Sequence, residues 1–69
     1  MSKYLLNEIL IFRCDSEGEG KLLIENIKKE KEVISQEIKK IEKKSDIFYR
    51  VKIKTRINDE SNPEFSYDL

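Results

Sequence analysis

The chain has 69 residues, with 14 basic and 14 acidic side chains, a formal net charge of zero, one cysteine and no histidine. A domain of this length buries only about 60% of the surface of its unfolded chain, so a single core is marginal and self-association is expected. The composition excludes an intrachain disulfide and a cysteine and histidine zinc site. No apolar run approaches the length of a membrane span or has the features of a signal peptide, so we expect a cytoplasmic protein.

The first predicted element covers residues 3–14, with the sequence KYLLNEILIFRC. Its apolar side chains lie on both alternating faces, and the run ILIF is β-branched and aromatic, which favours a strand covered on both faces. A short helix is the alternative, because Leu6 and Leu10 are four residues apart. Residues 15–20 contain two glycines and are predicted to form a turn.

A change of period predicts a long helix over residues 21–44. Isoleucines follow a 3,4 heptad spacing, with an interruption at Lys31 where another apolar residue is expected. These positions are Ile24, Ile27, Ile34, Ile38 and Ile41. Opposite charges four residues apart, such as Glu25 and Lys29, support a solvated helix surface. The heptads also leave a coiled-coil dimer open as a mode of association.

Strict alternation predicts a second strand over residues 47–57. One face is largely apolar and the other is basic. The basic side chains are Arg50, Lys52, Lys54 and Arg56, which we call the basic row. They would project from the strand at intervals of about 6.6 Å, close to the spacing of phosphates along a strand of DNA. The basic row is therefore a candidate nucleic-acid-binding surface.

The last predicted region, residues 58–69, has Pro63, four acidic residues and only three sizeable apolar side chains. Such a composition is typical of a flexible segment that orders on a partner. We therefore expect a folded domain over residues 1–57 and an acidic, flexible tail over residues 58–69.

Together these elements predict an α/β fold, a two-layer strand-helix-strand (βαβ) unit whose two strands are parallel. Two strands and one helix leave the sheet edges open and the first strand half uncovered. We expect a homodimer with a four-stranded sheet and two helices to complete the fold.

No pattern predicts an enzyme, a metal site or a cofactor site. Cys14 precedes an acidic turn, where negative neighbours disfavour the reactive thiolate. The stretch from Gly18 to Lys21 lies between a predicted strand and helix, but it lacks the first glycine and the following hydroxyl residue of a phosphate-binding P-loop. Acids at 15, 17 and 19 lack the later ligands of a calcium loop. We therefore predict a non-enzymatic binding protein.

Acidic side chains form the other candidate surface. Glu30 and Glu37 are seven residues apart and would align on one flank of the predicted helix, and the tail adds acids among aromatic residues. Duplicated in a dimer, these acids would imitate a phosphate backbone and occupy the cationic groove of a DNA-binding protein, with aromatic side chains as anchors. The candidate partner-binding residues are Glu30, Glu37, Asp59, Glu60, Glu64, Phe65, Tyr67 and Asp68.

The segments KKEKEVISQEIKKIEKK (residues 28–44) and NDESNPEFSYDL (residues 58–69) occur in a chain without alanine, tryptophan or histidine. In size and composition the chain resembles the small early host-takeover proteins of large lytic phages of Bacillus-type hosts, among them inhibitors of the host histone-like nucleoid protein. The resemblance implies a homodimeric inhibitor, or DNA mimic, that binds a host DNA-binding protein in the host cytoplasm and blocks its DNA-binding surface. The alternative function is a small nucleic-acid-binding or regulatory protein that uses the basic row.

Overall fold

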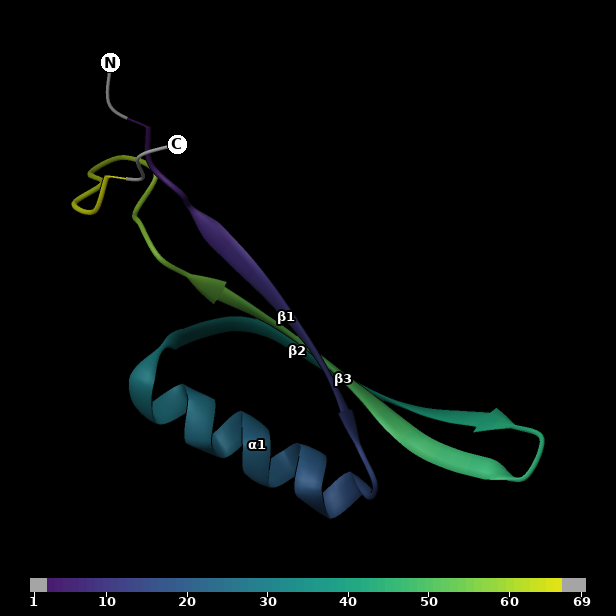
Figure 1. The fold of residues 1–69 in the computed structure, drawn as a ribbon. Coiled ribbons are helices and arrows are strands. Elements are labelled where there is room, and N and C mark those ends of the chain that lie inside the picture. The colour runs from purple at the N-terminus through teal and green to yellow at the C-terminus, as the bar shows by residue number, and fades with distance from the viewer. Residues whose placement is uncertain (1–2, 67–69) are drawn as a thin grey trace.

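The computed structural model describes residues 3–66 and has one helix and three strands (Figure 1). In chain order these are β1 (Asn7–Cys14), α1 (Glu17–Glu30), β2 (Glu32–Lys43) and β3 (Asp46–Arg56). The strands form one antiparallel sheet in the order β1-β3-β2, and α1 packs on one face of it. The predicted α/β class and two-layer packing are confirmed. The predicted βαβ unit with parallel neighbouring strands is wrong, because the strand over residues 46–56 runs antiparallel to β1.

Helix α1 is much shorter than predicted and also begins earlier. Ser16 caps its first turn, because the Ser16 hydroxyl accepts a hydrogen bond from the Glu19 backbone nitrogen at 3.2 Å. The helix ends at Glu30, where the next residue, Lys31, has extended backbone angles of φ −134° and ψ 153°. The described residues include no helix with the length and apolarity that crossing a bilayer requires.

Residues 32–43, predicted as the second half of the helix, form the edge strand β2. A bulge at Val33/Ser35 explains why their pattern is not that of a regular strand. Val33 pairs with Thr55 and Ile38 pairs with Val51, so the six residues 33–38 of β2 lie opposite the five residues 51–55 of β3. The inserted residue hides the period of two, and the remaining isoleucines fall at helical spacing.

The core lies between α1 and the central strand β3. Val51 and Ile53 are fully buried in the sheet, and Ile24 of the helix is buried against them. A Cβ atom on Gly20 would lie 2.9 Å from Cγ2 of Val51, so glycine is the residue that allows α1 to approach β3 this closely. The prediction that β1 is half uncovered in the single chain is confirmed, because nothing in the described residues covers the sheet face opposite α1, and Ile11 is 62% exposed there.

Residues 58–66, which we call the C-terminal segment, are attached to the N-terminal residues through Asn58. This side chain is buried, and its amide nitrogen donates to the backbone oxygens of Leu5 and Phe65, each at 2.8 Å. Its amide oxygen accepts from the backbone nitrogens of Glu64 at 3.0 Å and Phe65 at 2.8 Å. The predicted boundary at residue 57 therefore coincides with a hydrogen-bonded junction, and the flexibility of the tail stays a prediction.

The β2–β3 connection is a two-residue loop, because Lys43 pairs with Asp46. Lys44, its first residue, has a φ of 53°, which is unfavourable for a residue with a Cβ atom. We expect Lys44→Gly to raise the free energy of unfolding by about 1 kcal/mol, and the thermal midpoint by roughly 4–8 °C. Thermal unfolding followed by circular dichroism measures this change. Ser45→Gly, at a position without positive φ, is the control and should lower the midpoint; a Lys44→Gly midpoint at or below that of the wild type would contradict the strain.

Candidate nucleic-acid interface

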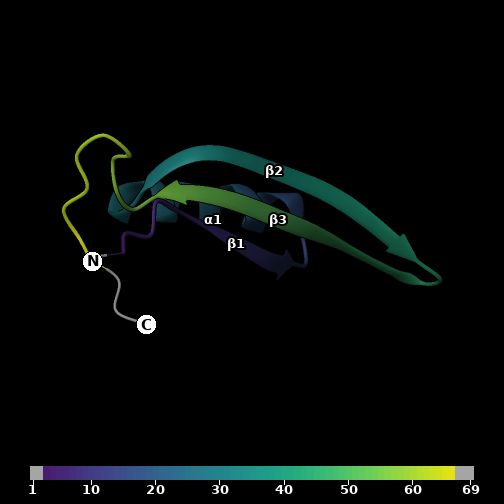
Figure 2. The same cartoon turned by 90° about the horizontal axis from the view of Figure 1, so that it is seen from above.

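The sheet face opposite α1, which we call the open face, carries the basic row along its central strand. Alternation on β3 turns Val51 and Ile53 towards the helix and places the even-numbered residues on the other side. The open face is towards the viewer in Figure 2, where α1 lies behind the strands. All four members of the row, Arg50, Lys52, Lys54 and Arg56, therefore share this uncovered surface.

The two flanking strands add further side chains to the open face, because directly opposed residues of an antiparallel pair point to the same side. From β1, Ile9 lies opposite Lys54, Ile11 opposite Lys52 and Arg13 opposite Arg50. From β2, Glu37 lies opposite Lys52 and Lys39 opposite Arg50. The sequence pattern did not predict these neighbours, because only the sheet order and the register bring them beside the basic row.

Positive charge predominates on the open face. Its cations are Arg13, Lys39, Lys43, Arg50, Lys52, Lys54 and Arg56, and its carboxylates are Glu32, Glu37 and Asp46. Glu32 is 3.6 Å from a guanidinium nitrogen of Arg56, in a well-exposed pair that contributes little to stability. Within residues 3–66, no carboxylate forms an ion pair with Arg50, Lys52 or Lys54. These three side chains therefore keep their charge available for a ligand.

Apolar side chains border the cations. Ile9 and Ile11 are 52% and 62% exposed, and both follow the basic row along β1. The guanidinium carbon of Arg13 lies 4.3 Å from the centre of the Phe48 ring, a cation–π contact between β1 and β3. The open face thus combines phosphate-binding groups with surfaces on which bases can pack.

The far end of the β2–β3 hairpin extends beyond the end of β1. β1 ends where Cys14 pairs with Tyr49, and the last rungs of the hairpin pair only β2 with β3 (Figure 1). We call residues 41–48 the hairpin arm; its charged side chains are Glu42, Lys43, Lys44 and Asp46. A two-stranded ribbon of this kind is narrow enough to enter a groove of a nucleic acid.

The predicted acidic surface is divided between separate parts of the fold. Glu30 is the last residue of α1, whereas Glu37 lies on β2 and on the open face, so the predicted alignment on one helix flank is wrong. The other described candidates, Asp59, Glu60, Glu64 and Phe65, lie in the C-terminal segment. Tyr67 and Asp68 lie outside the described residues.

The acids of the C-terminal segment gather beyond the end of the basic row. A hollow of about 300 Å³ lies there, and its lining includes Arg56, Asp59, Glu64 and Phe65. Charge is therefore separated along the sheet, with cations on the strands and acids at the Arg56 end. This arrangement places the two candidate surfaces side by side, although they were predicted as independent alternatives.

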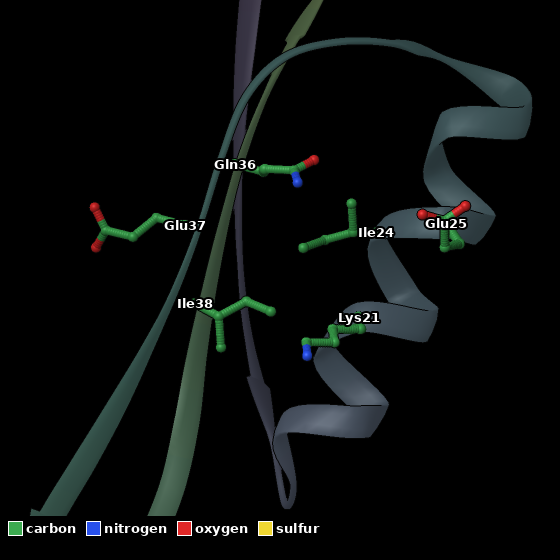
Figure 3. A pocket seen from close by; sticks show the side chains of 6 residues that line it. All are labelled: Lys21, Ile24, Glu25, Gln36, Glu37 and Ile38. Atoms are coloured by element: carbon green, nitrogen blue, oxygen red, sulfur yellow. The ribbon is translucent and has the colours of Figure 1, made fainter.

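A second hollow, of about 440 Å³, lies between α1 and β2 (Figure 3). It is lined by Lys21, Ile24, Glu25, Gln36, Glu37 and Ile38. The Glu37 side chain points away from the helix in Figure 3, towards the open face. Residues 3–66 contain no cluster of three or more acids, cysteines or histidines that would hold a metal ion.

Comparison with protein-family models, curated proteins and solved structures gives no match for this chain. The functional argument therefore rests on the geometry of the chain itself. Within that geometry, the open face combines an excess of cations with exposed apolar side chains on one uncovered surface.

Proposed function

We propose that this protein binds single-stranded nucleic acid on the open face of its sheet. One observation carries the proposal: the uncovered face presents the basic row, in which Arg50, Lys52 and Lys54 have no ion pair within residues 3–66, and exposed apolar side chains flank it. The basic row was the alternative prediction from the sequence, and its surroundings in the fold now favour it.

The cations supply affinity in this proposal. Lysine and arginine side chains that neutralise phosphates release condensed counterions, so binding weakens steeply as salt rises. The contact is to the backbone of the nucleic acid, so it carries no sequence preference of its own. A neutral net charge does not oppose this function, because the acids lie mainly outside the open face.

The apolar border distinguishes a single strand from a duplex. In a duplex the bases are stacked and paired, and the outer surface that meets a flat sheet consists of phosphates and sugars. In a single strand the bases are free to pack on Ile9, Ile11 and the Phe48 ring. We therefore expect tighter binding of a single strand than of a duplex with the same number of phosphates.

The inhibitor of a host DNA-binding protein stays a prediction from resemblance. The row of acids that would mimic DNA on the helix does not form, because Glu30 and Glu37 belong to different elements. The acids of the C-terminal segment are the remaining surface for such a partner. The non-enzymatic character, the cytoplasmic location and the homodimer are likewise predictions, and the four-stranded sheet expected of the dimer does not fit a chain that contributes three strands.

The proposal predicts that Lys52→Gln/Lys54→Gln weakens binding of a fluorescent oligothymidine and flattens its salt dependence. Loss of two phosphate contacts should reduce the slope of log K against log salt by about 1.4, since each contact to a single strand contributes about 0.7. Fluorescence anisotropy at several salt concentrations measures both quantities. The matched control is Lys28→Gln/Lys29→Gln, which removes the same charge from the last turn of α1.

The two double variants separate a local site from a general charge effect. An equal loss of oligothymidine affinity in both double variants would show that only the net charge matters. Absence of salt-dependent binding by the wild type would refute the proposal. A duplex oligonucleotide with the same number of phosphates tests the preference for a single strand. Tighter binding of the duplex would contradict the role of the apolar border.

A further inference from the structure

We infer that the free edge of β1 is an interaction surface for a second copy of this chain. The two β1 strands pair antiparallel, so that two three-stranded sheets become one continuous sheet of six strands. This inference rests on the proposed function for its consequence, because the second copy extends the nucleic-acid interface, but the pairing itself is argued from the edge.

The backbone of β1 has hydrogen-bonding groups directed away from the sheet. The Ile57 backbone nitrogen donates to the Leu6 oxygen at 2.9 Å, so the pair of Leu6 and Ile57 is of the hydrogen-bonded type. Such pairs alternate along an antiparallel ladder, which directs the polar groups of even-numbered β1 residues towards β3. The amide and carbonyl groups of the odd-numbered residues, Asn7, Ile9, Ile11 and Arg13, therefore point outward and need partners.

The side chains in the middle of this edge, residues 9–12, are apolar on both faces. Ile9 and Ile11 are exposed on the open face, and Phe12, on the helix side, is still 36% exposed. The pairing of β1 with β3 runs from Asn7 to Cys14 without a bulge. Charged side chains, a proline and a bulge are devices that natural sheets use against strand addition, and the central residues 9–12 of this edge have none of them.

The other edge, β2, has those devices. It contains the bulge at Val33/Ser35, and its second half is dominated by charged side chains. Lys40 and Glu42 form an exposed ion pair at 3.3 Å on this strand. Charges and a bulge both disfavour pairing with another strand, so the contrast between the edges selects β1.

The sequence of β1 defines a register in which it is complementary to itself. With the two-fold axis at Leu10, each Ile9 lies opposite the Ile11 of the second copy, and Asn7 lies opposite Arg13. These odd-numbered pairs are the ones whose outward groups exchange hydrogen bonds. No like charges are directly opposed, and all four isoleucines pair with one another. A shift by two residues would place Ile9 opposite Arg13 or Ile11 opposite Asn7.

Electrostatics disfavour the competing arrangement, in which two open faces stack. Stacked sheets lie about 10 Å apart, so the cations of both copies, Lys52 and Lys54 among them, would be buried against one another with fewer carboxylates to balance them. Edge pairing avoids this repulsion, because the basic rows remain on the surface. It also keeps both helices on the same side, so that the two open faces merge into one.

Edge pairing would bring the two basic rows and the isoleucines of both β1 strands together on one continuous face. The two β3 strands would lie three strand spacings apart, or about 14 Å, with a strip of four isoleucines between the basic rows. A nucleic-acid strand that crosses from one row to the other would contact this strip, to which each copy contributes Ile9 and Ile11. The site proposed for one chain is thus completed by the second.

Ile11→Lys tests the edge, because it adds a charge to the pairing surface at a residue that the single chain leaves 62% exposed. The control is Leu22→Lys on α1, where the replaced side chain is 63% exposed. Sedimentation equilibrium should show a dimer for the wild type and the control, and a dimer dissociation constant at least tenfold higher for Ile11→Lys. A monomeric wild type at about 100 µM, or an equal effect of both variants, would overturn the inference.

Cysteine cross-linking tests the register in a Cys14→Ser background. Leu10 faces its own copy in a non-hydrogen-bonded pair, with Cα atoms about 4.5 Å apart, which suits a disulfide. Leu10→Cys should therefore form a covalent dimer on mild oxidation, whereas Ile11→Cys should not, because it lies opposite Ile9. Efficient cross-linking of Ile11→Cys alone would overturn this register.

Oligonucleotide binding is measured separately on the same proteins. A dimer that cross-links through Leu10→Cys but binds no oligothymidine would refute the proposed function and support the edge pairing. A monomer that binds oligothymidine would support the proposed function and overturn the pairing.

Discussion

Asn58→Ala is expected to lower the free energy of unfolding by about 3 kcal/mol. The substitution removes four hydrogen bonds at a buried position, two donated by the amide nitrogen and two accepted by the amide oxygen. A typical intramolecular hydrogen bond contributes about 0.5–1.5 kcal/mol, and polar groups left without partners add a further penalty. The Leu5 and Phe65 carbonyl oxygens and the Glu64 and Phe65 amides would all lose this partner.

The effect is large in relation to the stability of the whole chain. At about 0.05–0.15 kcal/mol per residue, a domain of this size is stable by roughly 3–10 kcal/mol. The variant should therefore unfold at a markedly lower urea concentration. The exposed Asn62, in the same C-terminal segment, is the control, and its replacement by alanine should change stability by less than about 0.5 kcal/mol.

Urea unfolding at one fixed protein concentration measures both variants, since any association would make stability depend on concentration. Similar midpoints for Asn58→Ala and the wild type would show that the junction is not part of the cooperative unit. In that case the Tyr4 to Ser66 bridge, a backbone link between the N-terminal residues and the C-terminal segment, would also contribute little to stability.

The central and first strands were predictable because their residues carry a clear signal. In β3 the alternation of apolar and basic side chains survives, since the strand is covered on one face only and both of its neighbours are in regular register around Val51 and Ile53. In β1 the β-branched and aromatic run outweighed the helical spacing of Leu6 and Leu10. The basic row followed directly from the alternation, whereas its neighbours required the sheet order.

The misassigned half of the predicted helix has a physical explanation. β2 is an edge strand with a bulge, so few of its side chains must be apolar and the inserted residue breaks the alternation. Its isoleucines at 34, 38 and 41 then match helical spacing by coincidence. The interruption of the heptads at Lys31 was the informative signal, because α1 ends immediately before it.

The sequence contained a signal for the start of α1 but none for the role of Asn58. The Ser16 and Glu19 spacing is that of a capping box, which marks the start of α1 within the predicted turn. The Glu19 carboxylate accepts from the Asp15 backbone nitrogen at 3.2 Å. Asn58 had no such signal, because its four partners come from residues 5, 64 and 65 and only the folded chain brings them together.

The two faces of the sheet have different roles. The helix side of β3 provides the core, and the open side of the same strand provides the candidate interface. Variants on the open face should therefore change binding with little change in stability, since their side chains are mostly exposed. Variants on the helix side should do the reverse, which makes stability measurements an independent check on the assignment of faces.

Ile53→Ala provides that check and is expected to cost about 3 kcal/mol of stability, within the range of 2–5 kcal/mol typical of buried isoleucines. Ile53 is fully buried at the centre of a core with few members, so neighbouring side chains have little freedom to fill the cavity. Ile47→Ala is the matched control, because this residue lies on the same strand but is 56% exposed, and its replacement should cost less than about 1 kcal/mol.

A milder substitution keeps position 53 measurable if Ile53→Ala unfolds the chain completely. Ile53→Val removes one methylene group and should cost about 0.5–1.5 kcal/mol, which leaves the chain folded for measurement. Urea unfolding of the three variants should therefore rank them with Ile53→Ala least stable and Ile47→Ala near the wild type. An Ile47→Ala variant less stable than Ile53→Ala would mean that the hairpin arm, and not the helix-covered half of β3, contains the core. Ile47 lies on the same side of β3 as residues 51, 53 and 55, so the face assignment is tested by Ile53→Ala itself: a cost below about 0.5 kcal/mol would mean that the open face is on the other side of the strand.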